Sequence, residues 1–190
     1  MQKLLRGLCF SFFLIAPLAV AQADEYEQTK TIFQNAGESG TFFGKSYGYA
    51  LFPTIGKAGV IIGGAYGEGR VYKQGQYVGD TSMTQGSIGL QLGGQAFSQI
   101  IFFEDARAYR EFTSGNFEFG AEASAVAITA GASAQATTTG SSAGASGGKH
   151  DATTKANGFH KGMAIFTVAK GGLMFQAAVA GQKFTFTPNQ

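Results

Sequence analysis

The stretch from residue 46 to residue 72, SYGYALFPTIGKAGVIIGGAYGEGRVY, constrains the fold more than any other part of the chain. Its runs Tyr49–Phe52 and Val60–Ile62 are short, apolar and rich in aromatic or β-branched residues, which predicts two buried strands. Because Pro53 lacks the N–H that a sheet ladder needs, we expect the first strand to end there and a Pro-Thr-Ile-Gly-Lys turn to follow. Four glycines come next: Gly63, Gly64, Gly67 and Gly69. They predict a bulge or the close approach of another chain segment.

A diverged copy of this stretch lies near the C-terminus, in KGMAIFTVAKGGLMF at residues 161–175. The matched pairs are Gly48 with Gly162, Ala50 with Ala164, Phe52 with Phe166 and, after a one-residue deletion in the second copy, Lys57 with Lys170. Copies so far apart do not form a solenoid, whose repeats are short and contiguous. The pattern therefore predicts one domain with approximate internal symmetry.

The first residues have the three parts of a secretory signal peptide. Lys3 and Arg6 are basic, residues 8–15 are apolar, and Ala21-Gln22-Ala23 matches a cleavage site. We therefore expect residues 1–23 to be removed and the mature protein to be exported, to the periplasm, to the outer-membrane surface or beyond the cell if the source is bacterial. Cys9, the one cysteine, is lost with the leader, so no disulfide stabilises the mature chain.

Charge and composition exclude several classes of function. The chain has 14 Lys and Arg against 12 Asp and Glu, so loss of Lys3 and Arg6 leaves a neutral chain without a basic run, and no nucleic-acid partner is expected. The two histidines, His150 and His160, lack the spacing of metal ligands. The glycine run fits a β-bulge better than an anion-binding nest. No enzyme activity, catalytic residue, cofactor or metal is predicted.

Residues 24–190 are expected to form one domain, mainly β with two helices (α+β), as an antiparallel barrel-like or strongly twisted sheet. A Gly, Ser, Ala and Thr-rich segment, residues 131–158, is predicted to be a mobile loop because it has no large apolar side chain. The expected helices are residues 24–39, packed on the sheet, and residues 104–112. The expected strands include a hairpin over 69–78 and two strands within 82–103. A half-buried strand over 116–126 and a last strand over 177–186 follow.

The chain resembles the SYLF family of bacterial exported proteins and eukaryotic membrane-trafficking and actin-associated proteins. The phrases that carry the resemblance are ALFPTIGKAGVIIGGAYGEG, QGSIGLQLGGQ, FTSGNFEFGAEAS and GFHKGMAIFTVAKGGLMFQAAVAGQ, in this order. The resemblance implies that the protein binds lipid, as phosphatidylinositol-binding proteins do. The expected ligand is an anionic phospholipid or another amphiphile at a membrane surface. Actin is not an expected partner in the cell envelope of a bacterium.

Three cations are candidates for binding a lipid headgroup: Lys57, Arg70 and Lys170. The two lysines occupy the same place in the two copies, so they are either cations that meet one phosphate or solvated turn residues. Phe42, Phe43 and Tyr47 are candidates for membrane or acyl-chain contact, with core packing as the alternative. The competing function is a structural, oligomeric envelope protein that has no specific lipid ligand.

Export can be tested by the mass of the mature protein. Because the leader ends at Ala23, the exported protein should begin at Asp24. Intact-mass spectrometry of material recovered outside the cytoplasm measures this directly. A mature product that still contains Cys9 contradicts the prediction.

Overall fold

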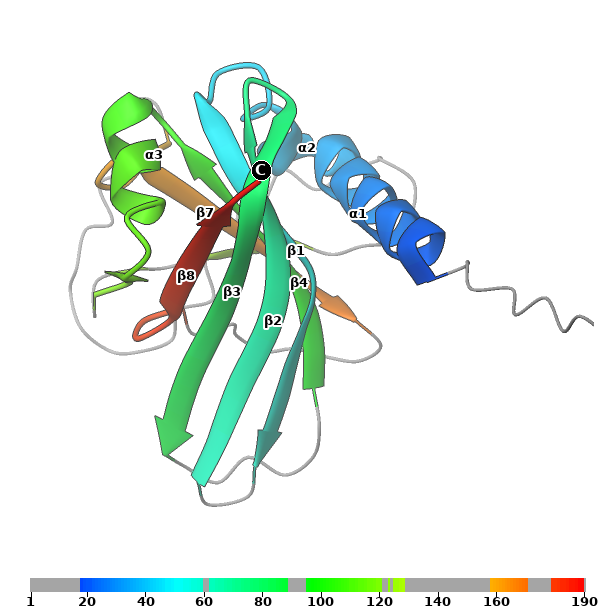
Figure 1. The fold of residues 1–190 in the computed structure, drawn as a ribbon, viewed down its shortest axis with the longest axis vertical. Helices are drawn as coiled ribbons and strands as arrows, with labels where there is room; N and C mark the ends of the chain where they lie inside the picture. The colour runs from blue at the N-terminus through cyan, green and yellow to red at the C-terminus, as the bar shows by residue number, and fades with distance from the viewer. Residues whose placement is uncertain are drawn as a thin grey trace, which may run out of the picture.

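The computed structural model describes residues 18–59, 62–88, 95–120, 123, 125–128, 158–170 and 179–189. The helices are α1 (Leu18–Asn35), α2 (Gly37–Gly40) and α3 (Ala106–Phe112). The strands are β1 (Gly48–Gly59), β2 (Ile62–Lys73), β3 (Gln76–Ile88), β4 (Gln95–Phe103), β5 (Phe117–Glu118), β6 (Val126–Ile128), β7 (Met163–Lys170) and β8 (Lys183–Pro188). They form one sheet in the order β5-β8-β3-β2-β1-β4-β7-β6 (Figure 1).

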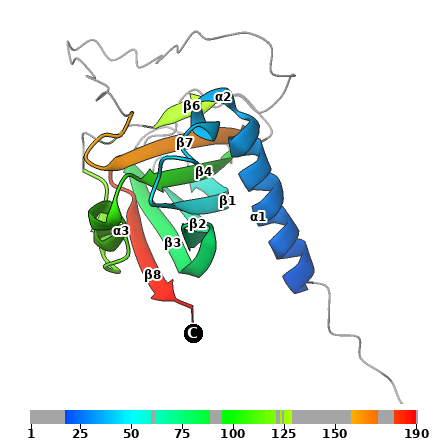
Figure 2. The same ribbon diagram turned by 90° about the horizontal axis from the view of Figure 1, so that it is seen from above.

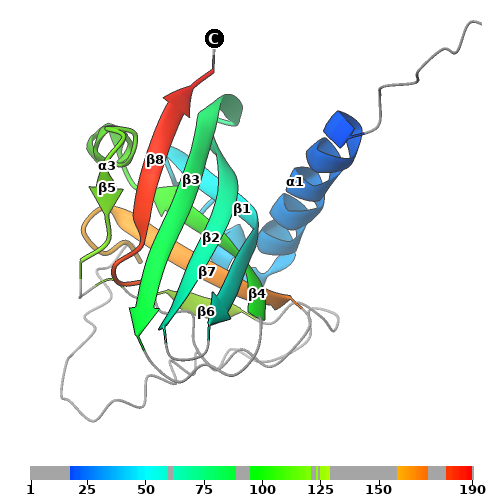
Figure 3. The same cartoon turned by 60° about the horizontal axis from the view of Figure 1, so that its bottom comes forward.

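The sheet is antiparallel throughout except that β6 runs parallel to β7, which confirms the mainly-β antiparallel prediction. It curls into a half-barrel, and Figure 3 shows β2 and β3 crossing over β4 and β7. β5 and β6 are close in sequence but lie at the two opposite edges of the sheet. Backbone bonds from Phe119 N to Gln182 O (3.0 Å) and from Gly181 N to Phe119 O (2.9 Å) tie the chain after β5 to the segment before β8.

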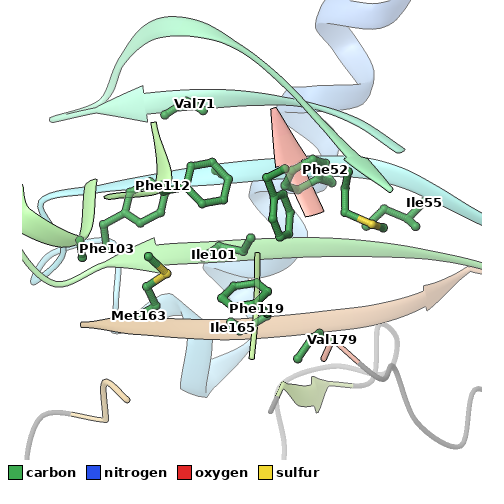
Figure 4. Close-up of a cluster of buried hydrophobic side chains, with 14 of the residues drawn as sticks. Phe52, Ile55, Val71, Ile101, Phe103, Phe112, Phe119, Met163, Ile165 and Val179 are labelled. Carbon is green, nitrogen blue, oxygen red and sulfur yellow. The ribbon is translucent and has the colours of Figure 1, made fainter. Parts of the chain in front are cut away.

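Apolar side chains cover both faces of the sheet, because successive strand residues point to opposite sides. The cluster inside the curl, here the inner face, contains Phe52, Ile55 and Phe103 and packs against Phe112 of α3 (Figure 4). The cluster on the outer face contains Leu51, Phe102 and Phe166 and lies under α1 and α2. Figure 2 shows α1 and α3 on opposite sides of the sheet.

Pro53 does not end a strand, so the predicted turn after Phe52 is wrong. β1 continues from Gly48 to Gly59, and its pairing with β2 and with β4 shifts by one residue around Pro53. A β-bulge leaves the extra residue unpaired, which removes the need for a proline N–H. The buried Ser98 hydroxyl donates to Pro53 O at 2.6 Å. This extra residue also accounts for the deletion in the second copy of the motif.

The two copies lie on either side of β4. Gly48 of β1 pairs with Phe103, and Phe103 pairs in turn with Met163 of β7. Both strands run antiparallel to β4 and therefore parallel to each other. Phe52 belongs to the inner cluster, whereas its counterpart Phe166 belongs to the outer one. The copies thus present matching residues to opposite faces.

Local turn and cap chemistry accounts for two confirmed predictions. In the β2–β3 hairpin, Gln74 (φ 50°) and Gly75 (φ 80°) form the two-residue loop between paired Lys73 and Gln76, as in a type I′ turn. At α3, the carboxylate of Asp105 accepts from Ala108 N at 2.8 Å and caps the helix.

Two other element predictions need correction. The expected single strand over 116–126 is wrong, because its ends belong to β5 and β6 on opposite edges. The first expected helix is divided into α1 and α2 by Ala36, whose backbone is extended (φ −78°, ψ 110°), so the described residues contain three helices and not two. Most of the expected leader, residues 1–17, and nearly all of the expected loop, residues 129–157, lie outside the described residues.

Glycines on the inner face of β2 let side chains of β1 pack directly on the backbone. A Cβ at Gly69 would lie 2.6 Å from the Phe52 ring, and one at Gly67 would lie 2.6 Å from Ile55 Cγ1. The expected close approach is therefore confirmed. The anion-nest alternative is not supported, because β2 is continuous strand from Ile62 to Lys73.

Replacing Gly69 should destabilise the fold. Gly69→Ala places a methyl group against Phe52 and within 2.8 Å of Leu51 O, so we expect the free energy of unfolding to fall by about 1–3 kcal/mol. Gly56→Ala is the matched control, because a Cβ there meets nothing within 4 Å and replaces a flexible glycine. Urea unfolding of both variants measures the difference. Equal losses would contradict this account of the inner face.

Candidate functional site

The sheet register separates the two lysines that were candidates for one phosphate. Ala96 of β4 pairs with Gly56 on one side and with Lys170 on the other, so these three residues share the outer face. Lys57 is the next residue after Gly56 and alternates to the inner face, two residues after Ile55. The expectation that both lysines meet one anion is therefore not supported.

Lys170 holds α1 against the sheet. Its Nζ donates to Glu25 Oε1 of α1 at 3.0 Å and to Thr54 Oγ1 of β1 at 2.6 Å. Thr54 Oγ1 in turn donates to Glu25 Oε1 at 2.7 Å. The hydrogen bonds from Thr54 and Lys170 lower the pKa of Glu25. Lys170 is thus engaged by a carboxylate of its own chain.

Arg70 makes the second attachment of α1. Its guanidinium lies 4.3 Å from the ring centre of Tyr26 on α1 and 5.3 Å from that of Tyr77 on β3, both within cation–π distance. Burial raises the pKa of the Tyr26 phenol, and the positive charge of Arg70 opposes that rise. Arg70 also lines an outer-face groove of about 380 Å³ between α1 and strands β2, β3 and β8.

The three aromatic candidates separate by burial. Phe42 is 4% exposed and packs on Phe102, with ring centres 5.5 Å apart, so it is a core residue of the outer cluster. Phe43 is half-buried, with its ring centre 5.2 Å from that of Tyr49. Tyr47 lies at the end of the sheet, with its ring centre 5.6 Å from that of Tyr109 on α3. Phe43 and Tyr47 are therefore the two members of this group that remain partly exposed.

Sequence reasoning missed a set of cations at the end of the sheet that carries Tyr47. Lys73 Nζ lies 5.5 Å from the ring centre of Tyr47 and 5.8 Å from that of Tyr109. Lys45 Nζ lies 4.0 Å from the ring centre of Phe42. We call the following set the basic end: Lys45, Tyr47, Lys73, Arg107, Tyr109, Arg110 and Lys161. Its five cations come from four separate segments, so they do not form a basic run that could be recognised in the sequence.

Backbone hydrogen bonds bring these segments to one end of the sheet. Tyr47 N donates to Phe103 O at 2.8 Å, Gln74 N donates to Tyr47 O at 3.2 Å, and Glu104 N donates to Gly162 O at 2.8 Å. Figure 1 shows α2, α3 and the β2–β3 turn at this same end.

Gly162 makes room for one cation of the basic end. Its φ is 84°, and a Cβ there would lie 2.5 Å from a terminal guanidinium nitrogen of Arg107. A side chain at this position would therefore displace the guanidinium. Since Lys161 directly precedes Gly162 in the chain, the glycine keeps Arg107 close to the segment that carries a second cation.

Carboxylates reduce the charge of the basic end without cancelling it. Arg107 lies 3.1 Å from Glu111 Oε2 and 3.9 Å from Asp105 Oδ2. The hydrogen bond from the backbone of Ala108 lowers the pKa of Asp105, and the charges of Arg107 and Arg110 lower it further. With Glu104 and, on α2, Glu38 included, four carboxylates lie at the end of the sheet that carries the five cations, which leaves a surplus of one positive charge.

Comparison with known proteins identifies the family. Residues 84–188, more than half of the chain, match the family model Ysc84, described as Las17-binding protein actin regulator. This chain belongs to that family, the SYLF family. It is also 28% identical over 159 residues to beta cell expansion factor A of Aeromonas veronii, covering 80% of this chain and 51% of that protein. The chain thus spans about half the length of this relative.

The family description names binding and regulation, and it names no reaction. Among the described residues, no group of three or more His, Cys, Asp or Glu side chains is placed to hold a metal ion. None of the described helices combines the length and the apolar character needed to cross a membrane.

The attachment of α1 should weaken in acid. Because the pKa of Glu25 is lowered in the folded chain, its ionised form stabilises the fold above the unfolded pKa, and this contribution is lost as the pH falls from about 5 toward 3. Both partners are partly exposed (36% and 45%), so we expect no more than about 1 kcal/mol. Urea unfolding of Glu25→Gln at pH 7 and pH 3.5 should show less pH dependence than the unmodified protein.

Glu27→Gln is the control for this prediction. Glu27 is 64% exposed and pairs with Lys30 of the same helix at 3.3 Å, so its loss leaves the contact with the sheet intact. The same reduction in pH dependence from both variants would show that Glu25 has no special role.

Proposed function

We propose that this protein is a non-enzymatic lipid-binding protein of the bacterial cell envelope, which recognises anionic phospholipid surfaces through the basic end. The observation that carries the proposal is the convergence of Lys45, Lys73 and Lys161 with Tyr47 and Tyr109 at one end of the sheet. Anionic surfaces attract clustered cations, and tyrosine rings with a polar tip suit the membrane interface.

The leader supports a location outside the cytoplasm, in the periplasm or on the outer-membrane surface. The family name refers to Las17 binding and actin regulation, and that of the Aeromonas veronii relative refers to beta cell expansion. For an exported chain we propose the lipid-directed part of the SYLF resemblance and not an actin partner. The ligand class is therefore an acidic glycerophospholipid headgroup, such as phosphatidylglycerol or a phosphoinositide.

The affinity that this surface can supply is modest. A Lys or Arg near an anionic membrane contributes about 1 kcal/mol, and the four carboxylates at this end of the sheet offset most of the charge of the five cations. Binding should therefore weaken as the salt concentration rises. The proposal does not assign headgroup binding to the three cations named from the sequence. Arg70 and Lys170 contact α1, and Lys57 is on the inner face.

Vesicle binding tests the proposal. Lys73→Gln removes one cation above Tyr47 and Tyr109 and should weaken binding to phosphatidylglycerol vesicles about fivefold, as measured by co-sedimentation. Lys45→Gln combined with Lys73→Gln should weaken it further. Vesicles of phosphatidylcholine alone should bind little of either protein.

Lys183→Gln is the matched control. Lys183 is 66% exposed and pairs with Glu118 at 3.6 Å at the β5 edge, away from the basic end. Equal losses from Lys183→Gln and Lys73→Gln would indicate diffuse attraction without a site. If the unmodified protein binds no anionic vesicle and forms a stable oligomer, the structural envelope function replaces the lipid-binding one.

A further inference from the structure

The outer-face groove has a polar lining that the lipid proposal does not use. Its residues are Tyr26 of α1; Tyr66, Glu68, Gly69 and Arg70 of β2; Asp80, Thr81 and Ser82 of β3; and Thr185 and Thr187 of β8. The Tyr66 hydroxyl donates to Glu68 Oε1 at 3.0 Å. The hydroxyl oxygens of Ser82 and Thr185 are 2.7 Å apart. Its volume of about 380 Å³ lies within the range of small-molecule sites.

Tyr66 stands at one end of this groove and is 52% exposed, the most exposed large apolar side chain among the described residues. Three of its neighbours on the same face are glycines. Gly56 pairs with Tyr66 across β1 and β2, Gly64 lies two residues earlier in β2, and Gly86 pairs with Gly64. The ring therefore borders a patch of sheet that carries no side chains on the β1 side and toward Gly64, whereas Thr84 of β3 pairs with Tyr66 on its other side.

These glycines are not required by crowding. A Cβ at Gly56 or Gly86 would meet nothing within 4 Å, and one at Gly64 would meet a single backbone oxygen at 3.4 Å, an ordinary contact. Glycine inside a strand costs about 0.5–1 kcal/mol relative to alanine, and β-branched residues suit this position better. The bare patch therefore lowers sheet stability while leaving the ring of Tyr66 accessible from the side.

We propose that this groove binds a flat, uncharged, β-1,4-linked oligosaccharide, with one sugar ring stacked on Tyr66. The apolar C–H face of a pyranose ring with equatorial substituents matches an aromatic ring. Its hydroxyl groups donate to the carboxylates of Glu68 and Asp80 and accept from Arg70 and Ser82. A β-1,4-linked chain is a flat ribbon, which suits the bare sheet beside Tyr66.

The charges of the groove favour an uncharged ligand over a phospholipid headgroup. Glu68 and Asp80 are two carboxylates, and Arg70 is the single cation, held between the rings of Tyr26 and Tyr77. A polyanion would meet repulsion here, whereas it meets a positive surplus at the basic end. The two sites therefore suit different ligands, and an experiment can contradict the proposal for one site without contradicting the proposal for the other.

Titration calorimetry with three tetrasaccharides tests the proposal. Cellotetraose or chitotetraose should bind saturably, and maltotetraose, which is α-linked and helical, should bind more weakly. Tyr66→Ala should weaken binding about tenfold because it removes the stacking ring. Gly86→Thr should weaken binding by placing a side chain on the glycine patch beside Tyr66, while its melting temperature should stay equal or rise.

Two controls keep the result specific. Tyr109→Ala, a tyrosine of the basic end, should leave sugar binding unchanged, and Tyr66→Ala should leave binding to phosphatidylglycerol vesicles unchanged. The proposal is overturned if neither β-linked tetrasaccharide binds, if maltotetraose binds equally well, or if Tyr66→Ala binds like the unmodified protein. A dimer that Gly86→Thr dissociates would also overturn it, because the patch would then be a contact between two copies of the chain.

Discussion

Direct packing of large side chains on glycine backbone is the contact on which the curled sheet depends. Phe52 lies on Gly69, Ile55 lies on Gly67, and the ring of Phe186 lies within 2.8 Å of the position of a Cβ at Gly79. Removing these Cβ atoms lets β1, β2 and β3 bend around a core with no gap between ring and backbone. The curl in turn leaves the outer face free for α1. At one end of this sheet, backbone hydrogen bonds join the segments that form the basic end.

Charged residues near α1 illustrate how a structural role can resemble a functional one in sequence. The sequence makes Lys170 and Arg70 candidates for binding a ligand, whereas in the structure both contact α1, through Glu25 and Tyr26 respectively. A cation on the outer face of a sheet finds its partners on whatever element covers that face, and here a helix covers it. The cations at the end of the sheet come instead from loops and from α3, and none of their printed contacts is with α1.

How much could be predicted from the sequence depended on the range of the interactions involved. The β2–β3 hairpin and α3 are defined by Gln74-Gly75 and by the Asp105 cap, which act within a few residues, and both were predicted. The strand through Pro53 was not, because a bulge and the Ser98 hydrogen bond act across strands. The basic end was missed for the same reason: its cations are scattered along the chain and meet only in three dimensions. Membership of the family, in contrast, was visible in contiguous phrases.

The bulge at Pro53 also bears on how a duplicated segment can change in length. Phe52 and Lys57 are five residues apart, whereas Phe166 and Lys170 are four apart, an odd and an even spacing. In an uninterrupted strand the odd spacing would send every later side chain to the wrong face. Because the bulge absorbs one residue, Ile55 returns to the same face as Phe52. The two copies therefore differ in length by one residue, yet Phe52 and Lys57 share one face of β1 just as Phe166 and Lys170 share one face of β7.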